Sequence, residues 1–140
     1  MILVGVLVAF SPKDKNGNPK GKALKGYAGA GAAAEVKKVS ARDRVTKGYD
    51  VEIVLDGDTW PQTALQVQEA ILDHEMTHIV VDDQRADGGK LNISMRPEDF
   101  IAWGFWEVIE RHGKAAIEHK SLKALEEKHG QLLLEIGENS

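Results

Sequence analysis

The stretch Ala70-Ile-Leu-Asp-His-Glu-Met-Thr-His-Ile-Val-Val-Asp82 decides how the rest of the chain is interpreted. It contains His74-Glu75-Met76-Thr77-His78, a complete H-E-x-x-H pattern. On an α-helix, residues four apart lie on one face, so both imidazoles can point at the same metal ion. Glu75 follows the first histidine and is placed to take a proton from a metal-bound water. The pattern predicts a catalytic zinc site, with His74 and His78 as ligands and Glu75 as general base.

Two simpler explanations of the pattern fit less well. A random order of the same residues would produce H-E-x-x-H in roughly 1–2% of such chains. A helix that carries two histidines on a solvated face is also possible, but these histidines continue an apolar face formed by Val67, Ile71 and Val81. Partly buried imidazoles beside a glutamate cost free energy unless a metal or dedicated partners satisfy them.

Composition limits the kinds of protein and of metal site. The 140 residues predict a single domain, 1–140, with 42% hydrophobic and 29% charged residues, as in ordinary soluble proteins. The chain has no cysteine, which excludes disulfides and thiolate metal sites and is compatible with the cytosol. Any zinc ligands must therefore be His, Asp or Glu, a set more typical of catalytic than of structural sites.

Charge is spread unevenly along the chain. Residues 1–48 hold ten Lys and Arg against three acids, a net of +7, and residues 49–140 hold eight against nineteen, a net of −11. A basic half can bind nucleic acid or another acidic surface. The interpretation we favour from sequence is a lysine-guarded hairpin whose exposed edge resists aggregation, because the lysines lack interleaved aromatic residues for base stacking.

The apolar start of the chain, residues 1–10, predicts a strand and no targeting or membrane segment. It lacks a basic n-region and a small-residue cleavage site, and ten residues are too few to span a bilayer. Residues 2–10 are apolar on both faces, which predicts a central or well-covered strand. We therefore expect a cytoplasmic protein that does not bind membranes.

The remaining pattern predicts an α+β fold. A β-rich half covers 1–58, with further strands predicted at 35–40 and 50–56. The metal helix is predicted over 59–82, with Thr59 as N-cap and Gln62 as its capping-box partner. A small mixed or antiparallel sheet of about three or four strands is expected to pack against this helix.

Two C-terminal helices are predicted over 97–136. A loop at 83–92 must first reverse the chain. The first of the two helices should end at His112, before the C′ glycine Gly113. Residues 114–136 form the second, and both helices are expected to cover the sheet and the metal helix.

The residues alone leave the third ligand open, although a catalytic zinc needs one. The candidates are acids and histidines after the motif: Asp82, Glu98, Asp99, Glu107, His112 and His119. Asp82 would lie one turn beyond His78, where its short side chain cannot reach the ion. Asp73 and Asp82, with Asp99 beside the next helix start, are instead expected to accept hydrogen bonds around the ligands or to be solvated.

Three segments resemble the putative phage metallopeptidase family, a zincin-like group from phages and prophages. They are residues 72–78, the stretch Leu91-Asn-Ile-Ser-Met-Arg-Pro-Glu-Asp99, and Glu110-Arg-His-Gly113. In the family the second segment usually reads Met-Arg-x-His-Asp, and that histidine is the expected third ligand. Here Glu98 stands in its place, so the resemblance implies a zincin-like fold with Glu98 as third ligand.

The leading hypothesis is a zinc-dependent peptidase of phage type that acts on a protein or peptide in the host cytosol, with host and phage proteins as candidate substrates. One alternative is a non-catalytic, metal-stabilised binding or inhibitor protein on the same frame. Another is a nucleic-acid-associated, SprT-like protease that uses the basic residues 13–47 as its anchor. The sequence does not indicate an oligomeric state.

Overall fold

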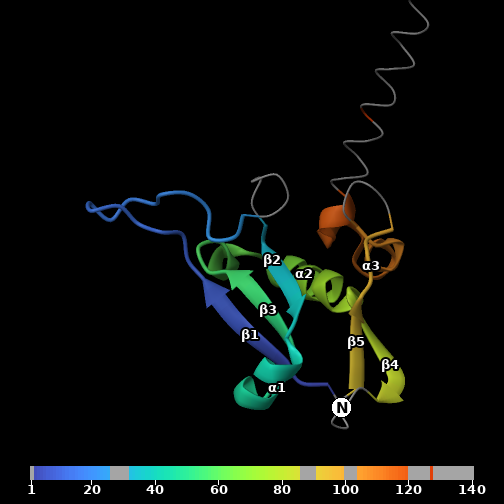
Figure 1. The fold of residues 1–140 in the computed structure, drawn as a ribbon. Helices are drawn as coiled ribbons and strands as arrows, with labels where there is room; N and C mark the ends of the chain where they lie inside the picture. Colours follow the sequence, from blue (N-terminus) through green and yellow to red (C-terminus); the bar gives the residue numbers. More distant parts are fainter. Residues whose placement is uncertain (1, 26–31, 86–90, 100–103, 120–126, 128–140) are drawn as a thin grey trace, which may run out of the picture.

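A three-stranded mixed sheet forms one part of the molecule (Figure 1). The computed structural model describes residues 2–25, 32–85, 91–99, 104–119 and 127. The strands are β1 (Val4–Ala9), β2 (Ala34–Lys38) and β3 (Val51–Asp56), in the order β1-β3-β2. β1 runs parallel to β3 and β2 antiparallel to it, so the sheet is mixed, as predicted.

The central strand is β3, and the prediction that residues 2–10 form a central or well-covered strand is wrong. In β3, Val51 is fully buried and Ile53 nearly so. Strand β1 lies at the edge, and Val6, Val8 and Phe10 are each more than half exposed. The core under the sheet joins residues of β2, β3 and the following helix: Ala34, Ile53, Leu55 and Ile71. An apolar run on both faces is equally compatible with an edge strand that this core leaves uncovered.

A short helix, α1 (Ala41–Lys47), connects β2 to β3 and was not among the predicted elements. The Ser40 side chain accepts a hydrogen bond from the backbone N–H of Asp43, and Gly48 ends the helix with a left-handed φ of 77°. Both are standard helix boundary signals. Seven residues are too few to show a clear helical spacing of apolar side chains. Ser40 and Gly48 were therefore the sequence features that could have indicated this helix.

The motif helix is shorter than predicted at both ends. A 3₁₀ turn at Trp60–Gln62 precedes α2 (Leu65–Thr77), and the Thr59 side chain makes no capping hydrogen bond. At the other end the helix stops at Thr77 instead of residue 82, and β4 (Ile79–Arg85) begins almost at once. Three consecutive β-branched residues, 79–81, favour the extended conformation over another helical turn.

Strands β4 and β5 (Leu91–Met95) form an antiparallel hairpin after α2. Ile79 pairs with Met95, and the Arg96 backbone N–H donates to the His78 carbonyl at 2.6 Å. The chain therefore does reverse between residues 83 and 92, as predicted, but through two paired strands. The reversal returns residues 96–99 to the end of α2.

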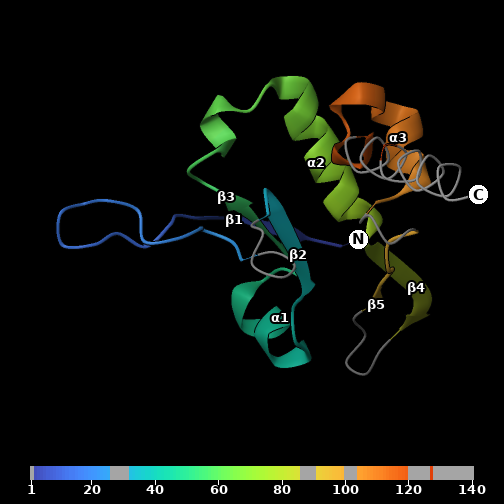
Figure 2. The same cartoon turned by 90° about the horizontal axis from the view of Figure 1, so that it is seen from above.

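The C-terminal part begins with α3 (Trp106–His112), which packs beside α2 (Figure 2). Gly113 ends α3 as predicted, but residues 97–99 are not helical, so the predicted start was wrong. A 3₁₀ turn at Gly113–Ala115 leads to helical residues 117–119, and most of the predicted helix at 114–136 lies outside the described residues. No helix in the described part is long and apolar enough to cross a membrane.

A buried arginine joins the sheet to the hairpin. Arg44 of α1 donates from Nε to Asp50 at 2.8 Å and from a terminal nitrogen to the Leu91 carbonyl at 3.0 Å. The same Asp50 carboxylate accepts the Leu3 backbone N–H. Because Arg44 and Asp50 are both buried, losing either would leave the other charge without its partner. This pair fixes where the hairpin begins its return towards α2.

Candidate metal centre

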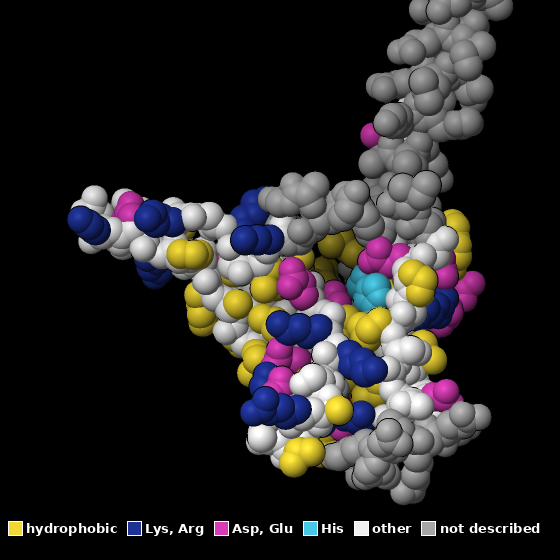
Figure 3. Space-filling view, in the orientation of Figure 1, with side chains coloured by type: hydrophobic (Ala, Val, Ile, Leu, Met, Phe, Trp, Pro, Cys, Tyr) yellow, Lys and Arg dark blue, Asp and Glu magenta, His cyan; other side chains and the backbone are white. Residues whose placement is uncertain are grey.

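Three electron-pair donors converge beside the C-terminal end of α2. His74 Nε2 lies 3.2 Å from Glu98 Oε1, and His78 Nε2 lies 3.6 Å from the same oxygen. The ligand atoms of the three residues all lie within 4.8 Å of one another. Figure 3 shows histidine side chains in a hollow of the surface, with acidic side chains beside them. Two imidazoles and a carboxylate are a donor set that can bind a metal ion.

Two structural features bring the donors together. His74 lies in the last turn of α2 and His78 is its C-cap residue, and their ring centroids are 5.1 Å apart. Glu98 arrives through the β4–β5 hairpin, whose pairing places residue 96 opposite residue 78. A reversal of the chain at 83–92 was expected from the sequence, and the hairpin register brings Glu98 beside the motif.

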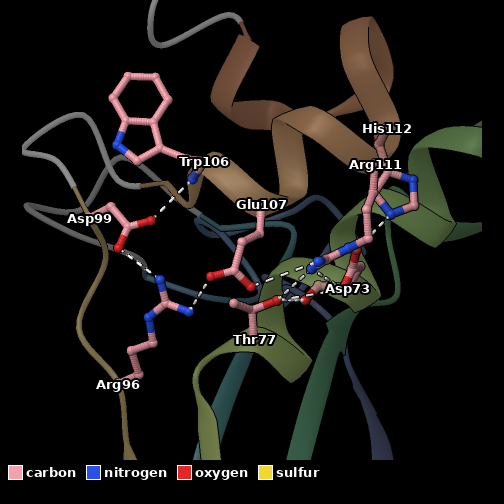
Figure 4. A network of polar contacts seen from close by, with 8 residues as sticks. All are labelled: Asp73, Thr77, Arg96, Asp99, Trp106, Glu107, Arg111 and His112. Atoms are coloured by element: carbon pink, nitrogen blue, oxygen red, sulfur yellow. Dashed lines mark hydrogen bonds and ion pairs between the residues drawn. The ribbon is translucent and has the colours of Figure 1, made fainter.

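The residues on either side of Glu98 are held by α3 (Figure 4). The Arg96 guanidinium donates to Glu107 of α3 and to Asp99, each at 2.8 Å. The Asp99 carboxylate also accepts the backbone N–H of Trp106, at the start of α3. These contacts restrain the backbone before and after Glu98, so its carboxylate is directed towards the histidines.

Both imidazoles are oriented through their Nδ1 atoms. His78 Nδ1 lies 2.7 Å from the Arg96 carbonyl oxygen, which can only accept, so this nitrogen carries the proton. His74 Nδ1 lies 3.2 Å from Glu118 Oε1. With Nδ1 as donor, each neutral ring turns the lone pair of Nε2 towards Glu98. Lone pairs that face a carboxylate oxygen require a proton or a metal cation between them.

Glu118 is the functional residue that sequence reasoning missed. Its side chain is fully buried, and Oε2 makes no hydrogen bond with the described residues. Carboxylates that hold the second nitrogen of a histidine ligand fix its tautomer and raise its basicity. No local sequence pattern marks Glu118, because 44 residues separate it from His74.

Glu75, between the two histidines in the sequence, is buried and has a strongly shifted pKa. Burial raises the pKa of this carboxyl to about 7, Glu98 adds to the rise, and His74 opposes it. For His74, burial lowers the pKa of the imidazole, but Glu118 and other nearby carboxylates outweigh burial and leave it raised. A carboxyl that titrates near neutral pH has the proton affinity a general base needs.

Phe105 forms an apolar wall against both histidines. Its ring is fully buried and lies 5.1 Å from the His74 ring and 4.8 Å from the His78 ring, centroid to centroid. Close packing on one side restricts rotation of the imidazoles, so the two Nε2 atoms keep their direction. Phe105 immediately precedes α3, which adds a second way in which α3 supports the site.

The remaining candidates have other places. Asp73 contacts Arg111 and His112 of α3, with His112 Nε2 at 2.8 Å, and so joins α2 to α3. The hydrogen bond from Arg111 is the main reason that the pKa of Asp73 is lowered. Asp82 lies on β4, not on α2, and is exposed. Asp73 and Asp82 were expected to accept hydrogen bonds from the His74 and His78 rings. Those rings instead contact Glu118 and the Arg96 backbone carbonyl.

Asp99 and two other ligand candidates, Glu107 and His112, also lie elsewhere. Asp99 holds Arg96, Glu107 pairs with Arg96 and Arg111, and His112 pairs with Asp73. Within the ranges that the structure describes, His74, His78 and Glu98 are the one group of three such residues whose ligand atoms converge.

Replacing Glu118 with Gln should weaken metal binding about 10-fold or more, because the His74 ring loses a charged partner while the side-chain shape is kept. Affinity for Zn²⁺ can be measured by competition with a chromophoric chelator. Glu110→Gln, an exposed glutamate of α3, is the matched control and should bind as the wild type does. Equal affinities for the two variants would contradict the assigned role of Glu118.

The metal-free protein should lose stability as the pH rises from 5 to 8. The pKa of Glu75 is raised in the folded state, to about 7, so the folded state favours the protonated carboxyl and is disfavoured once it ionises. The expected loss is roughly 2–3 kcal/mol, measured by urea unfolding. Glu75→Gln, which mimics the protonated form, should show a flatter profile, with the part due to His74 remaining. An unchanged slope in this variant would contradict the raised pKa.

Comparison with known proteins agrees with this geometry. A family model described as "Putative phage metallopeptidase" matches residues 10–129. No curated protein and no solved structure matches the chain significantly. The matched range is most of the chain and includes all three converging donors and Glu75. The resemblance predicted from residues 72–113 is therefore confirmed, and the chain belongs to the family described as "Putative phage metallopeptidase".

Proposed function

We propose that this protein is a zinc-dependent peptidase with a zincin-like site, in which His74, His78 and Glu98 hold the metal and Glu75 is the general base. The observation that carries the proposal is the convergence of three donor atoms, two of which belong to imidazole rings already held through Nδ1. When bound, zinc would supply a water of lowered pKa and polarisation of the scissile carbonyl.

Two of the three donor separations fit this ion, and all three lie within 4.8 Å. Zinc bonds of 2.0–2.2 Å in a tetrahedral arrangement separate neighbouring ligand atoms by about 3.4 Å. The two separations from Glu98 Oε1, 3.2 Å and 3.6 Å, lie on either side of that value. Two imidazoles with one carboxylate are also a known ligand set of catalytic zinc. Three protein donors leave one position of a tetrahedron for water or substrate.

Glu75 would take the proton of the attacking water and pass it to the leaving amine. Its raised pKa in the metal-free site reflects burial among other carboxylates. A cation held by the neighbouring residues would favour the ionised form, so Glu75 would be ready to accept a proton at neutral pH. After proton transfer, the carboxylic acid is a matched donor for the amine that leaves as the peptide bond breaks.

The substrate expected at such a site is an extended segment of a protein or peptide. Among the described strands β2 is an edge strand, and it packs against α2. An exposed strand edge can pair with the backbone of an extended chain, independently of side-chain sequence. This arrangement would place a substrate peptide alongside β2, next to the helix that carries Glu75.

The proposal predicts that Glu75→Gln retains zinc but loses turnover of a labelled, unfolded protein by about 10²–10⁴-fold, because the general base is removed while the ligands stay. Glu69→Gln, an exposed glutamate of the same helix, is the control and should stay active. Zinc-loaded wild type without hydrolysis of unfolded proteins or peptide mixtures would reject the enzyme and favour a binding protein. Full activity of Glu75→Gln would reject Glu75 as the base.

A further inference from the structure

Residues 11–25 form a narrow arm that extends away from the sheet, as both ribbon views show (Figures 1 and 2). The arm folds back on itself around a turn: Lys13 and Pro19 form an isolated bridge, and the Lys20 backbone N–H donates to the Pro12 carbonyl. Asp14 accepts the backbone N–H groups of Asn16 and Asn18 and so closes the turn. The arm therefore has a defined tip.

The arm concentrates positive charge. Its five lysines are exposed: Lys13, Lys15, Lys20, Lys22 and Lys25. The only acid among these residues is Asp14, which gives a net charge of +4. Figure 3 shows Lys and Arg side chains along the protruding part of the molecule. The rest of the chain carries the opposite balance, a net charge of −8.

Protection of a sheet edge does not explain these lysines. The exposed edge strand β1 has no charged residue of its own, whereas the lysines lie beyond its end in the arm. Inside the arm the two branches share one isolated bridge, so there is no extended ladder to protect. The fold instead brings the branches carrying Lys13 and Lys20 together, and like charges on neighbouring strands are destabilising.

We propose that the arm is a docking element for the phosphate backbone of duplex nucleic acid. Phosphate contacts need exposed cations and backbone groups, and the arm supplies both. Protein interfaces rely on aromatic, Arg and large apolar anchors, and membrane-surface segments on an apolar face. The arm has no aromatic residue and no Arg, and its single large apolar side chain, Leu24, is buried.

The same composition predicts binding without sequence preference. Base edges are read mainly by Arg, Asn and Gln pairs and by apolar contacts, and single-stranded bases by stacking on aromatic rings. The lysines of the arm provide positive charge but neither specific contacts to base edges nor aromatic stacking. None of the residues proposed to hold or use zinc lies in the arm, so this inference does not depend on the proposed peptidase activity.

The test is fluorescence anisotropy with a labelled duplex DNA of mixed sequence, titrated with the full chain between 50 and 200 mM salt. The triple variant Lys13→Gln, Lys15→Gln and Lys20→Gln should bind at least about ten-fold more weakly at low salt. The slope of log K against log salt should become shallower by about 3, because three phosphate contacts are lost. A second duplex of unrelated sequence should bind the wild type equally well.

The matched control removes the same charge from exposed sites outside the arm: Lys38→Gln, Arg42→Gln and Lys114→Gln. It should change duplex affinity less than about two-fold. Three results would overturn the inference: no duplex binding by the wild type at 50 mM salt, equal losses in the two triple variants, or tighter binding to poly-glutamate or to phosphatidylserine vesicles than to the duplex.

Discussion

The site depends on two hydrogen bonds between His78 and Arg96. The backbone N–H of Arg96 donates to the His78 carbonyl, and the His78 ring donates from Nδ1 to the Arg96 carbonyl. The pairing of His78 with Arg96 thus closes the base of the β4–β5 hairpin and fixes the orientation of the His78 imidazole. It also places Glu98 two residues further on, within reach of both histidines. A shift of register by one residue would turn the Glu98 side chain to the other side of the extended chain.

The cost of the arrangement lies in its buried acids. Glu75 and Glu118 are both buried near Glu98, and one oxygen of Glu118 makes no hydrogen bond with the described residues. Burial of carboxylates in one place is unfavourable without compensating charge. Two protonatable imidazoles offset part of this cost, and a divalent cation would offset more. The site is therefore a region where stability and function are coupled, as strained sites in other proteins are.

The expected convergence of His74, His78 and Glu98 is found in the structure, whereas several of the predicted elements around it have other bounds. H-E-x-x-H is a local pattern, so His74, Glu75 and His78 could be identified from spacing on one helix. Glu98 came from resemblance, because nothing local shows which downstream acid returns to the motif. Glu118 was missed for the same reason, since its link to His74 spans 44 residues.

Two of the errors in secondary structure have a common cause. The end of α2 and the position of β1 were both mispredicted from apolar runs, at 79–81 and 2–10. Such runs suit helix, central strand and edge strand alike, and tertiary pairing decides among them. The C-terminal glycine signal at Gly113 was reliable because it reflects local backbone conformation.

The measurement that tests the central claim most directly is zinc content and affinity of the wild type, Glu98→Ala and Glu110→Ala, by elemental analysis and chelator competition. If the hairpin delivers Glu98 as the third ligand, the wild type and Glu110→Ala hold one zinc per chain. Glu98→Ala should then bind zinc at least about 10-fold more weakly. Unchanged zinc affinity in Glu98→Ala would contradict the account, because the donor returned by the hairpin would not be a ligand.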